Sequence, residues 1–221
     1  MIYQLIFLTL MKNYHHFKYT DMMYTKKEYI DLLKSTRREN INYVIEELEE
    51  LGFFLAPAST NFHSNHKEGL LEHSLKVCKV GLMLREQMIN MNPDLESQLP
   101  LDSVILCTLL HDVCKSDIYK PAIKKRKNNF GVWEEYRGYD VDYSNFPLGH
   151  GEKSVIMLLR MGLELSDEEI MAIRWHMTAW DLAFQSQEMK ANLNAAKDKT
   201  PLCCIVQTAD GLATNLLEYK D

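Results

Sequence analysis

Residues 101–117 read LDSVILCTLLHDVCKSD, and this stretch decides the fold. Its first ten residues are almost all apolar, over a length that indicates a helix buried on most of its faces. We predict this helix for residues 101–114, with Asp102 as its N-cap. Because His111 and Asp112 follow the most apolar part directly, two strongly polar side chains are expected inside the core.

Further helices are expected on both sides of this segment. A Ser or Thr followed three residues later by Glu forms a capping box at Thr25 with Glu28 and at Ser166 with Glu169. Pro201 suits the first turn of a last helix. The expected helical ranges are 25–36, 41–51 with Asn40 as cap, 70–88, 151–161, 166–184 and 201–217. Helix following helix predicts an all-α fold, with a small irregular or β-hairpin insert near 118–147.

The chain has 221 residues, which suits one domain with a sizeable core. We assign residues 25–221 to that domain, including the helices within 25–52, and residues 1–24 to an N-terminal extension. This extension is disordered or docked, or else precedes a true start at Met11 or Met22. Its apolar residues 2–10 are too few to span a bilayer, so no membrane partner is expected.

The net charge of -6 argues against a surface for long nucleic acids, which needs clustered Lys and Arg. A small phosphorylated substrate remains compatible with this charge, because a bound cation can supply local positive charge. The five cysteines are odd in number and contain no C-x-x-C pair, which is typical of a reducing compartment. We therefore expect a cytoplasmic protein, and the oligomeric state stays open.

Four polar residues lie on helical faces that should be apolar. His73 shares its stripe with Val77, Asp210 lies on the apolar stripe of the last helix, and His111 and Asp112 follow the apolar run. Burying an ionised carboxylate is costly unless a cation or several donors meet it. Taken singly, a histidine bonded to a carbonyl or an aspartate paired with a buried arginine explains each position. Taken together, the four residues indicate a divalent metal.

Three ordered segments carry a family resemblance: GLLEHSLKV with His73, LLHDVCK with His111 and Asp112, and QTADGLAT with Asp210. They resemble the H…HD…D signature of the HD-domain superfamily of metal-dependent phosphohydrolases, over about residues 60–217. The resemblance implies an antiparallel helical bundle whose ligands project inward. It also implies that these four residues bind the metal.

Two further histidines extend the resemblance, His150 in GHGEKSV and His176 in AIRWHMTAW. Branches of the family that are similar here add two histidines to hold a second ion, which implies that Asp112 bridges both ions. His150 could also be a helix cap. The expected cofactor is one or two divalent ions of Fe, Mn, Co, Ni or Zn, with Mg as a further candidate. The glycine-tyrosine-proline segment of the cyclic-dinucleotide branch is absent, so that substrate is not carried over.

Besides Asp112, two residues are candidates for a catalytic role. Lys115 lies on the same side of the helix as Asp112 and could contact a phosphoryl oxygen, or it could be a surface lysine. The family often has a histidine before the first ligand, so His63 could bind phosphate or activate the leaving group. Asp117 could orient Lys115 or be solvated, and Cys114 is expected to be structural.

The insert near 118–147 carries the basic run 124–127 and the aromatic residues Trp133, Tyr136 and Tyr139. The run could grip an anionic substrate, although we expect a solvated hairpin edge. The aromatic side chains could stack on a base, although we expect them to form the insert's own small core.

The predicted function is hydrolysis of a phosphoester in a nucleotide or short oligonucleotide by a metal-activated water. Two alternatives remain open. One is a diiron oxygenase of the same fold, and the other is a catalytically silent module that binds a nucleotide.

Overall fold

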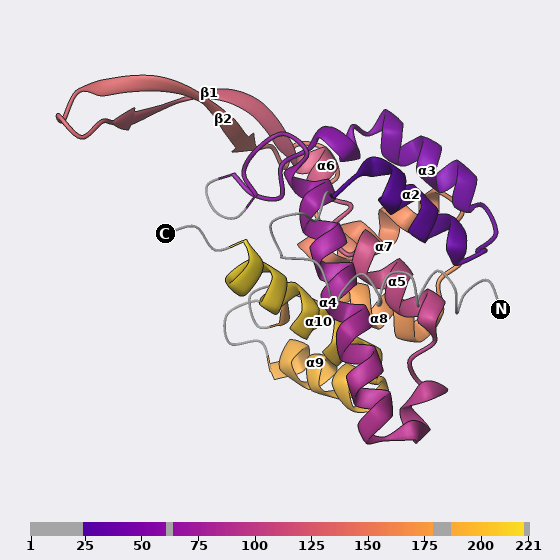
Figure 1. The fold of residues 1–221 in the computed structure, drawn as a ribbon. Helices are drawn as coiled ribbons and strands as arrows, with labels where there is room; N and C mark the ends of the chain where they lie inside the picture. The colour runs from indigo at the N-terminus through magenta and orange to yellow at the C-terminus, as the bar shows by residue number, and fades with distance from the viewer. Residues whose placement is uncertain (1–23, 61–63, 179–186, 219–221) are drawn as a thin grey trace, which may run out of the picture.

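The structure, a computed structural model, describes residues 24–60, 64–178 and 187–218. Within these ranges a body of packed helices carries one long β-hairpin that projects from it (Figure 1). The predicted all-α fold with a hairpin insert is therefore confirmed. Predictions for residues 1–23, including the alternative start sites, and for His63 lie outside the described residues. Among the described residues, no helix is both long and apolar enough to cross a membrane.

The helices follow one another along the chain. Before the hairpin they are α2 (Lys26–Ser35), α3 (Ile41–Glu50), α4 (Gly69–Met91), α5 (Leu101–Leu110) and α6 (Lys115–Ile118), with 3-10 turns η2 (Phe53–Leu55) and η3 (Pro93–Glu96). The hairpin consists of β1 (Tyr119–Lys127) and β2 (Trp133–Val141). After it come α7 (His150–Arg160), α8 (Asp167–Arg174), α9 (Gln187–Lys199), α10 (Pro201–Leu212) and the π-helical turn η5 (Ala213–Leu217).

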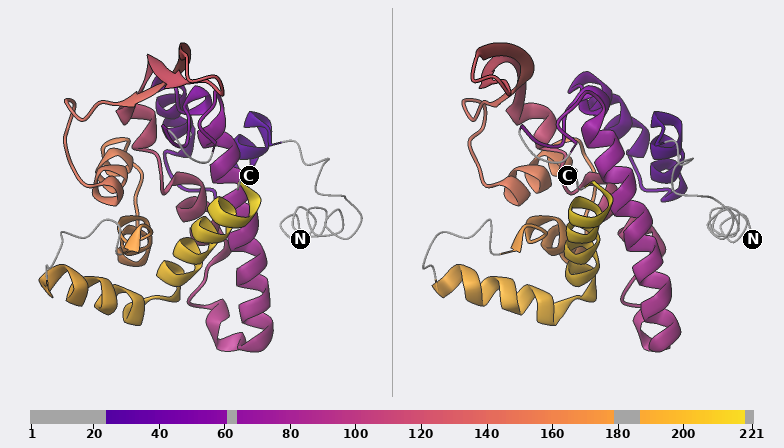
Figure 2. Two further views of the ribbon diagram at one scale, coloured as in Figure 1. Left: turned by 90° about the vertical axis from the view of Figure 1, so that its left-hand side faces the viewer. Right: turned by 60° about the vertical axis from the view of Figure 1, so that its left-hand side comes forward.

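Helix α4 runs through the body and contacts both α5 and α10 (Figure 1 and Figure 2). Leu75 of α4, Leu106 of α5 and Val206 of α10 are fully buried in one core cluster. Full burial of such a side chain contributes about 1.5–3 kcal/mol. Tyr29 of α2 packs against the same cluster, and its hydroxyl donates to the carbonyl oxygen of Leu109 at 2.9 Å. This packing brings the polar residues of α4, of the end of α5 and of α10 into one interior region.

The predicted start signals of several helices are present. The Ser166 hydroxyl accepts a hydrogen bond from the Glu169 backbone N–H at 3.3 Å, and the Glu169 carboxylate accepts one from the Ser166 N–H at 2.9 Å. This reciprocal pair confirms the capping box of α8. The Thr25 hydroxyl accepts from the Glu28 N–H at the start of α2, and Pro201 occupies the first turn of α10.

Of two predicted N-caps, Asn40 stands at the N-cap position of α3 without a capping bond, and Asp102 is not the N-cap of α5. Asn40 has a left-handed backbone at φ 62° and no capping bond; its side-chain amide donates instead to the carbonyl oxygen of Gly162 at 2.9 Å. Asp102 lies inside α5, which begins after Pro100, and its carboxylate pairs with Arg38 at 2.9 Å. In both cases a partner distant in sequence binds the side chain that local reasoning assigned to the backbone.

The helical ranges differ from the prediction in several places. The α-helix expected over 201–217 ends at Leu212 and continues as the π-helical turn η5. The helix expected over 101–114 ends at Leu110, and the chain then forms tight turns, such as the one closed by the Val113 N–H on the Leu110 carbonyl at 3.2 Å. The helix expected over 166–184 ends at Arg174, and 179–186 lie outside the described residues. Helix α9 was not predicted, because its buried Leu193 and Ala196 sit in a polar stretch with little periodic signal.

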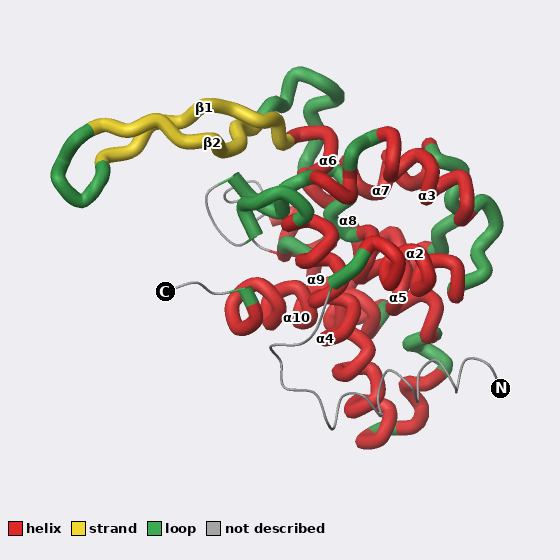
Figure 3. Tube along the Cα trace, turned by 45° about the horizontal axis from the view of Figure 1, so that its top comes forward, coloured by secondary structure: helices red, strands yellow, loops and turns green. Residues whose placement is uncertain are grey.

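Strands β1 and β2 pair antiparallel, from Tyr119 opposite Val141 to Lys127 opposite Trp133, and appear alone in yellow in Figure 3. The expectation of an aromatic core within the insert is wrong for Trp133, whose surface is 64% exposed. A two-stranded hairpin that projects from the body has no other element packed on its faces, so side chains on those faces stay exposed. The ring of Trp133 instead lies under the ammonium group of Lys127, and the ring of Tyr136 lies under a guanidinium group.

The basic run of the hairpin is matched by acidic residues across the strands. Arg126 pairs with Glu134 at 2.7 Å, and Lys125 lies 3.4 Å from Glu135. Lys124 lies 3.4 Å from Asp140 on the same pair of strands. These exposed pairs contribute little stability, but they neutralise much of the run.

The start of α7 packs closely against the end of α8. A Cβ atom on Gly151 would lie 2.2 Å from the carbonyl oxygen of Arg174, so a larger residue would force the two helices apart. This close approach places His150, the first residue of α7, beside His176, which follows α8. The centroids of the two imidazole rings are 5.4 Å apart.

Gly151→Ala should destabilise the protein by about 1–3 kcal/mol, because the added methyl group overpacks this contact. Gly211→Ala is the matched control, since Gly211 also lies in a helix but its added Cβ would meet nothing within 4 Å. Alanine favours a helix over glycine by about 0.5–1 kcal/mol. Thermal unfolding should therefore show a lower Tm for the first variant only. Equal losses in both variants would contradict the close packing of α7 on α8.

Candidate metal centre

The six predicted metal ligands meet in the interior of the helical body. They are His73 on α4, His111 and Asp112 directly after α5, His150 at the start of α7, His176 after α8, and Asp210 on α10. They form three overlapping groups in which the candidate ligand atoms lie within 4.8 Å of one another. Residues from five parts of the sequence thus share one small volume.

The first group surrounds the Oδ2 atom of Asp112. The Nε2 atom of His73 lies 3.3 Å from both His111 Nε2 and Asp112 Oδ2, and 3.4 Å from Asp210 Oδ1. His111 Nε2 is also 3.3 Å from Asp112 Oδ2. Ligand atoms about 2.1 Å from a common ion lie about 3.0–3.4 Å apart in octahedral or tetrahedral arrangements. The spacing of His73, His111 and Asp112 therefore fits the ligand shell of a single ion, whereas Asp210 Oδ1 lies farther from His111 Nε2, at 3.9 Å.

The second group surrounds the other oxygen of the same carboxylate. His150 Nε2 contacts Asp112 Oδ1 at hydrogen-bonding distance, and His176 Nε2 lies 3.4 Å from that oxygen. The two oxygens of Asp112 thus face two different sets of imidazole nitrogens. This division is what a carboxylate shared between two ions requires.

Backbone carbonyl groups fix the orientation of two of the imidazole rings. His111 Nδ1 donates to the Thr108 carbonyl oxygen at 2.9 Å, and His176 Nδ1 donates to the Ile173 carbonyl oxygen at 2.6 Å. A neutral imidazole that donates from Nδ1 carries its lone pair on Nε2. In its neutral form each ring would direct a lone pair into the cluster, as histidines that bind metals do.

His176 provides the clearest test of whether the cluster suits a metal. Its Nε2 atom is buried and has no hydrogen-bond partner among the described residues. Burial lowers the pKa of His176, which keeps the ring neutral near pH 7. A buried nitrogen with a free lone pair is costly unless something accepts that lone pair. A metal ion would accept this lone pair, and the residues of the cluster therefore suit a metal ion.

The carboxylates of the cluster stay ionised although they are buried. Burial alone would raise the pKa of Asp112, but Lys115, His111 and His150 hold it well below its usual range. Burial likewise opposes ionisation of Asp210, whose pKa the hydrogen bond from His73 depresses. Two buried negative charges in one volume require compensating positive charge from protons or from a metal ion.

Without an ion, bound protons supply part of that positive charge. Burial disfavours the charged form of His150, yet its interactions with Cys114 and Asp112 raise its pKa to about 10. A metal that binds His150 must displace this proton, because histidine binds metals in its neutral form.

Lys115 is buried rather than placed at the surface, so the alternative of a surface lysine is wrong. It is 7% exposed, and its ammonium nitrogen lies 2.5 Å from Asp112 Oδ2. The packing of α6 directly after the tight turns at 111–114 holds the side chain in the core. Lys115 therefore presents a cation at the first group of ligands.

The remaining candidate residues lie around the cluster. Asp117 pairs with Lys153 and accepts from the side chain of Asn145 at 2.9 Å. Cys114 is fully buried, and its backbone N–H donates to Ser154 at 3.3 Å, which agrees with a structural cysteine. The predicted phosphate contact at His63 lies outside the described residues.

Sequence reasoning missed two buried charged residues, one of which contacts the cluster. Lys153 is 2% exposed and follows His150 by three residues, a spacing that could have identified it. Glu218 is 5% exposed, and its Oε1 atom lies 2.9 Å from His73 Nδ1. No helical periodicity in the sequence marked Glu218.

The division of the cluster around Asp112 predicts unequal losses in two variants. Asp112→Ala should remove both ions, whereas His176→Ala should spare the ion at His73 and His111 and lose mainly the other. The purified protein should contain a transition metal, and at about 100 times the Kd the free ion should add about 2.7 kcal/mol of stability. Elemental analysis and thermal unfolding measure both effects. Equal metal loss in the two variants would contradict two groups that share Asp112.

Comparison with known proteins adds one match. The HD domain family model matches residues 70–215, which is more than half of the chain and includes all six residues of the cluster. No curated protein and no solved structure matches the chain. Members of the family are metal-dependent phosphohydrolases, and the order of the histidines and aspartates here agrees with their signature. The chain belongs to the HD domain family.

Proposed function

We propose that this protein hydrolyses a phosphoester in a nucleotide or short oligonucleotide. The observation that carries the proposal is the Asp112 carboxylate, whose two oxygens face separate groups of histidine nitrogens. A carboxylate in this position would suit two divalent ions, which would supply Lewis acidity and lower the pKa of a nucleophilic water.

The residues of the cluster form two sets of ligands, one for each ion. His73, His111 and Asp112 would hold one ion, and Asp112, His150 and His176 would hold the other. Asp210, which lies 3.4 Å from His73 Nε2 and also forms a group with His111 and His176, would join the first ion. Imidazole ligands favour Fe, Mn, Co, Ni or Zn over Mg.

Within the part of the chain that the structure describes, Lys115 is well placed to act on the substrate. Its ammonium group lies beside Asp112 in a buried setting, where a charge acts more strongly than in water. From that position it can contact a phosphoryl oxygen and neutralise the charge that grows there during attack. It also keeps Asp112 ionised and able to bind a metal.

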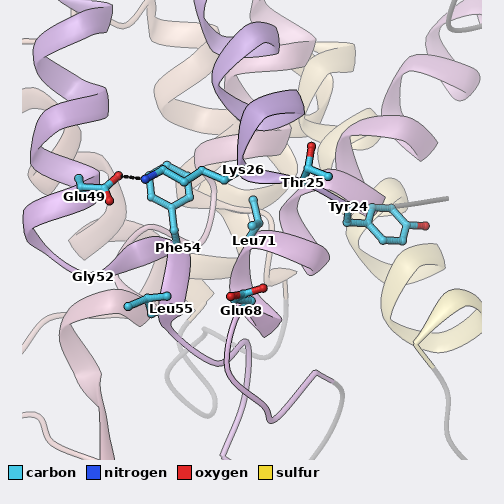
Figure 4. A pocket seen from close by; sticks show the side chains of 9 residues that line it. All are labelled: Tyr24, Thr25, Lys26, Glu49, Gly52, Phe54, Leu55, Glu68 and Leu71. Carbon is cyan, nitrogen blue, oxygen red and sulfur yellow. Dashed lines mark ion pairs between the residues drawn. The ribbon is translucent and has the colours of Figure 1, made fainter.

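A separate cavity of about 450 Å³ lies beside α2, η2 and the start of α4 (Figure 4). None of its lining residues belongs to the histidine and aspartate cluster. Glu49 and Glu68 line it, and Lys26 is already paired with Glu49. Carboxylates and a neutralised lysine disfavour a phosphate, so we place the substrate at the cluster.

The proposal predicts metal-dependent turnover of a phosphoester. Protein loaded with Mn, Co, Ni or Fe should hydrolyse a member of a panel of nucleotides and model phosphodiesters, and Asp112→Ala should reduce kcat by at least about 100-fold. Oxygen consumption by a redox-active diiron form, without phosphoester cleavage, would replace the proposal with an oxygenase. Bound metal and bound nucleotide without turnover would replace it with a binding module.

The charge distribution predicts a short substrate. Because the hairpin's basic run is largely paired with acidic residues, the substrate should meet few free cations. The dependence of log kcat/KM on log salt should then correspond to fewer than about four phosphate contacts. Neutralising residues 124–127 together should raise KM more than it lowers kcat if the run binds substrate at all. A steep salt dependence, or a preference for long strands, would contradict this expectation.

A further inference from the structure

We propose that Glu218 is a positioning residue for the metal centre, acting through His73. The inference rests on the metal centre of the proposed function but not on the reaction carried out there. Glu218 does not face the cluster itself; it contacts the side of the His73 ring that points away from the other ligands.

Both carboxylate oxygens of Glu218 have a partner. Oε1 lies 2.9 Å from His73 Nδ1, and Oε2 accepts a hydrogen bond from the Ser64 hydroxyl at 2.9 Å. The side chains of Glu218 and His73 are 1% and 0% exposed, so water does not compete for these contacts. A neutral His73 ring that donates from Nδ1 carries its lone pair on Nε2, the atom that lies 3.3 Å from His111 Nε2 and Asp112 Oδ2. A metal bound there must therefore displace the Nε2 proton that His73 shares with Asp210.

The π-helical turn η5 places Glu218 where it can reach His73. The Glu218 N–H bonds the Ala213 carbonyl at 3.0 Å, a step of five residues instead of the four of an α-helix. The turn therefore holds one extra residue, and Glu218 takes the position that an uninterrupted helix would give to Leu217. Ala213 is fully buried against Val77 of α4, which fixes the turn beside His73.

The loop before α4 holds the other partner of Glu218 in place. The carbonyl oxygen of Ser64 accepts from the Ala58 N–H at 3.0 Å, and Ser64 itself is 3% exposed. A Cβ on Gly69 would lie 1.9 Å from the Ser64 carbonyl oxygen, so only glycine permits the loop to lie this close to α4. Ser64 thereby fixes the second oxygen of Glu218, and the carboxylate keeps one orientation toward His73.

A carboxylate acts on a metal-binding histidine more strongly than a carbonyl does. The carbonyl partners of His111 and His176 fix the ring orientation, whereas Glu218 also brings a negative charge. That charge makes the His73 imidazole a stronger donor and favours a cation nearby. Loss of such a partner typically costs about 10–100-fold in metal affinity.

Two variants of Glu218 separate its charge from its hydrogen bond. Glu218→Ala should weaken binding of Co²⁺ and Zn²⁺ by about 10–100-fold and change the visible spectrum of the Co²⁺ form. Glu218→Gln keeps a carbonyl oxygen that can accept from Nδ1 and should recover part of that loss. Competition with a chelator of known affinity measures the Kd of each variant without any assay of activity.

Glu169→Gln is a matched control, because Glu169 is also a buried carboxylate but pairs with Arg38 in the cap of α8. It should lower the Tm and leave the metal Kd unchanged. In a His73→Ala background, Glu218→Ala should cause no further loss of affinity, since its effect passes through His73.

An unchanged Kd in Glu218→Ala, or an equal loss in the His73→Ala background, would overturn this inference and leave the proposed function standing. Wild-type protein that binds neither Co²⁺ nor Zn²⁺ would instead overturn the metal centre, and this inference with it.

Discussion

The burial of one carboxylate, that of Asp112, sets the requirements that the rest of the structure meets. Its residue is 2% exposed, and an isolated carboxylate at such a depth would cost several kcal/mol, on the order of what a whole domain gains on folding. Lys115 and the surrounding imidazole groups lower this cost by holding the pKa of Asp112 down. Each of these groups comes from a different turn or helix. The packing of the helices therefore determines which charged groups surround Asp112.

The two halves of the site are built by different means. His73 and His111 depend on helices α4 and α5, which meet along the main core. His150 and His176 depend on a local contact, in which Gly151 lets the start of α7 approach the end of α8. A change in the main core should affect the first half, and a change at Gly151 should affect the second. Asp112 belongs to both, because its two oxygens face in different directions.

Most of the fold could be predicted from the sequence, and so could the six residues that meet in the cluster. Four of them were marked by their place on or beside apolar helical segments, and His150 and His176 by the family resemblance. A histidine or aspartate on an apolar helical stripe must be buried, as His73 is beside Val77, and a buried charge needs a partner. Local capping signals were misleading at Asn40 and Asp102, because the side chain of each binds a group that is distant in sequence. The exposure of Trp133 could not be predicted from the sequence, because it depends on whether another element packs over the hairpin. The contact of Glu218 with His73 could not be predicted, because the π turn before Glu218 shifts the helical register by one residue.

The central claim is that Asp112 is shared between two metal ions. Anomalous diffraction from crystals of the metal-loaded protein, recorded on both sides of the absorption edge of the metal, tests it most directly. The account predicts two separate peaks, one among His73, His111, Asp112 and Asp210 and the other among Asp112, His150 and His176. No peak beside Asp112, or a single ion that leaves His150 and His176 unbound under saturating metal, would contradict it.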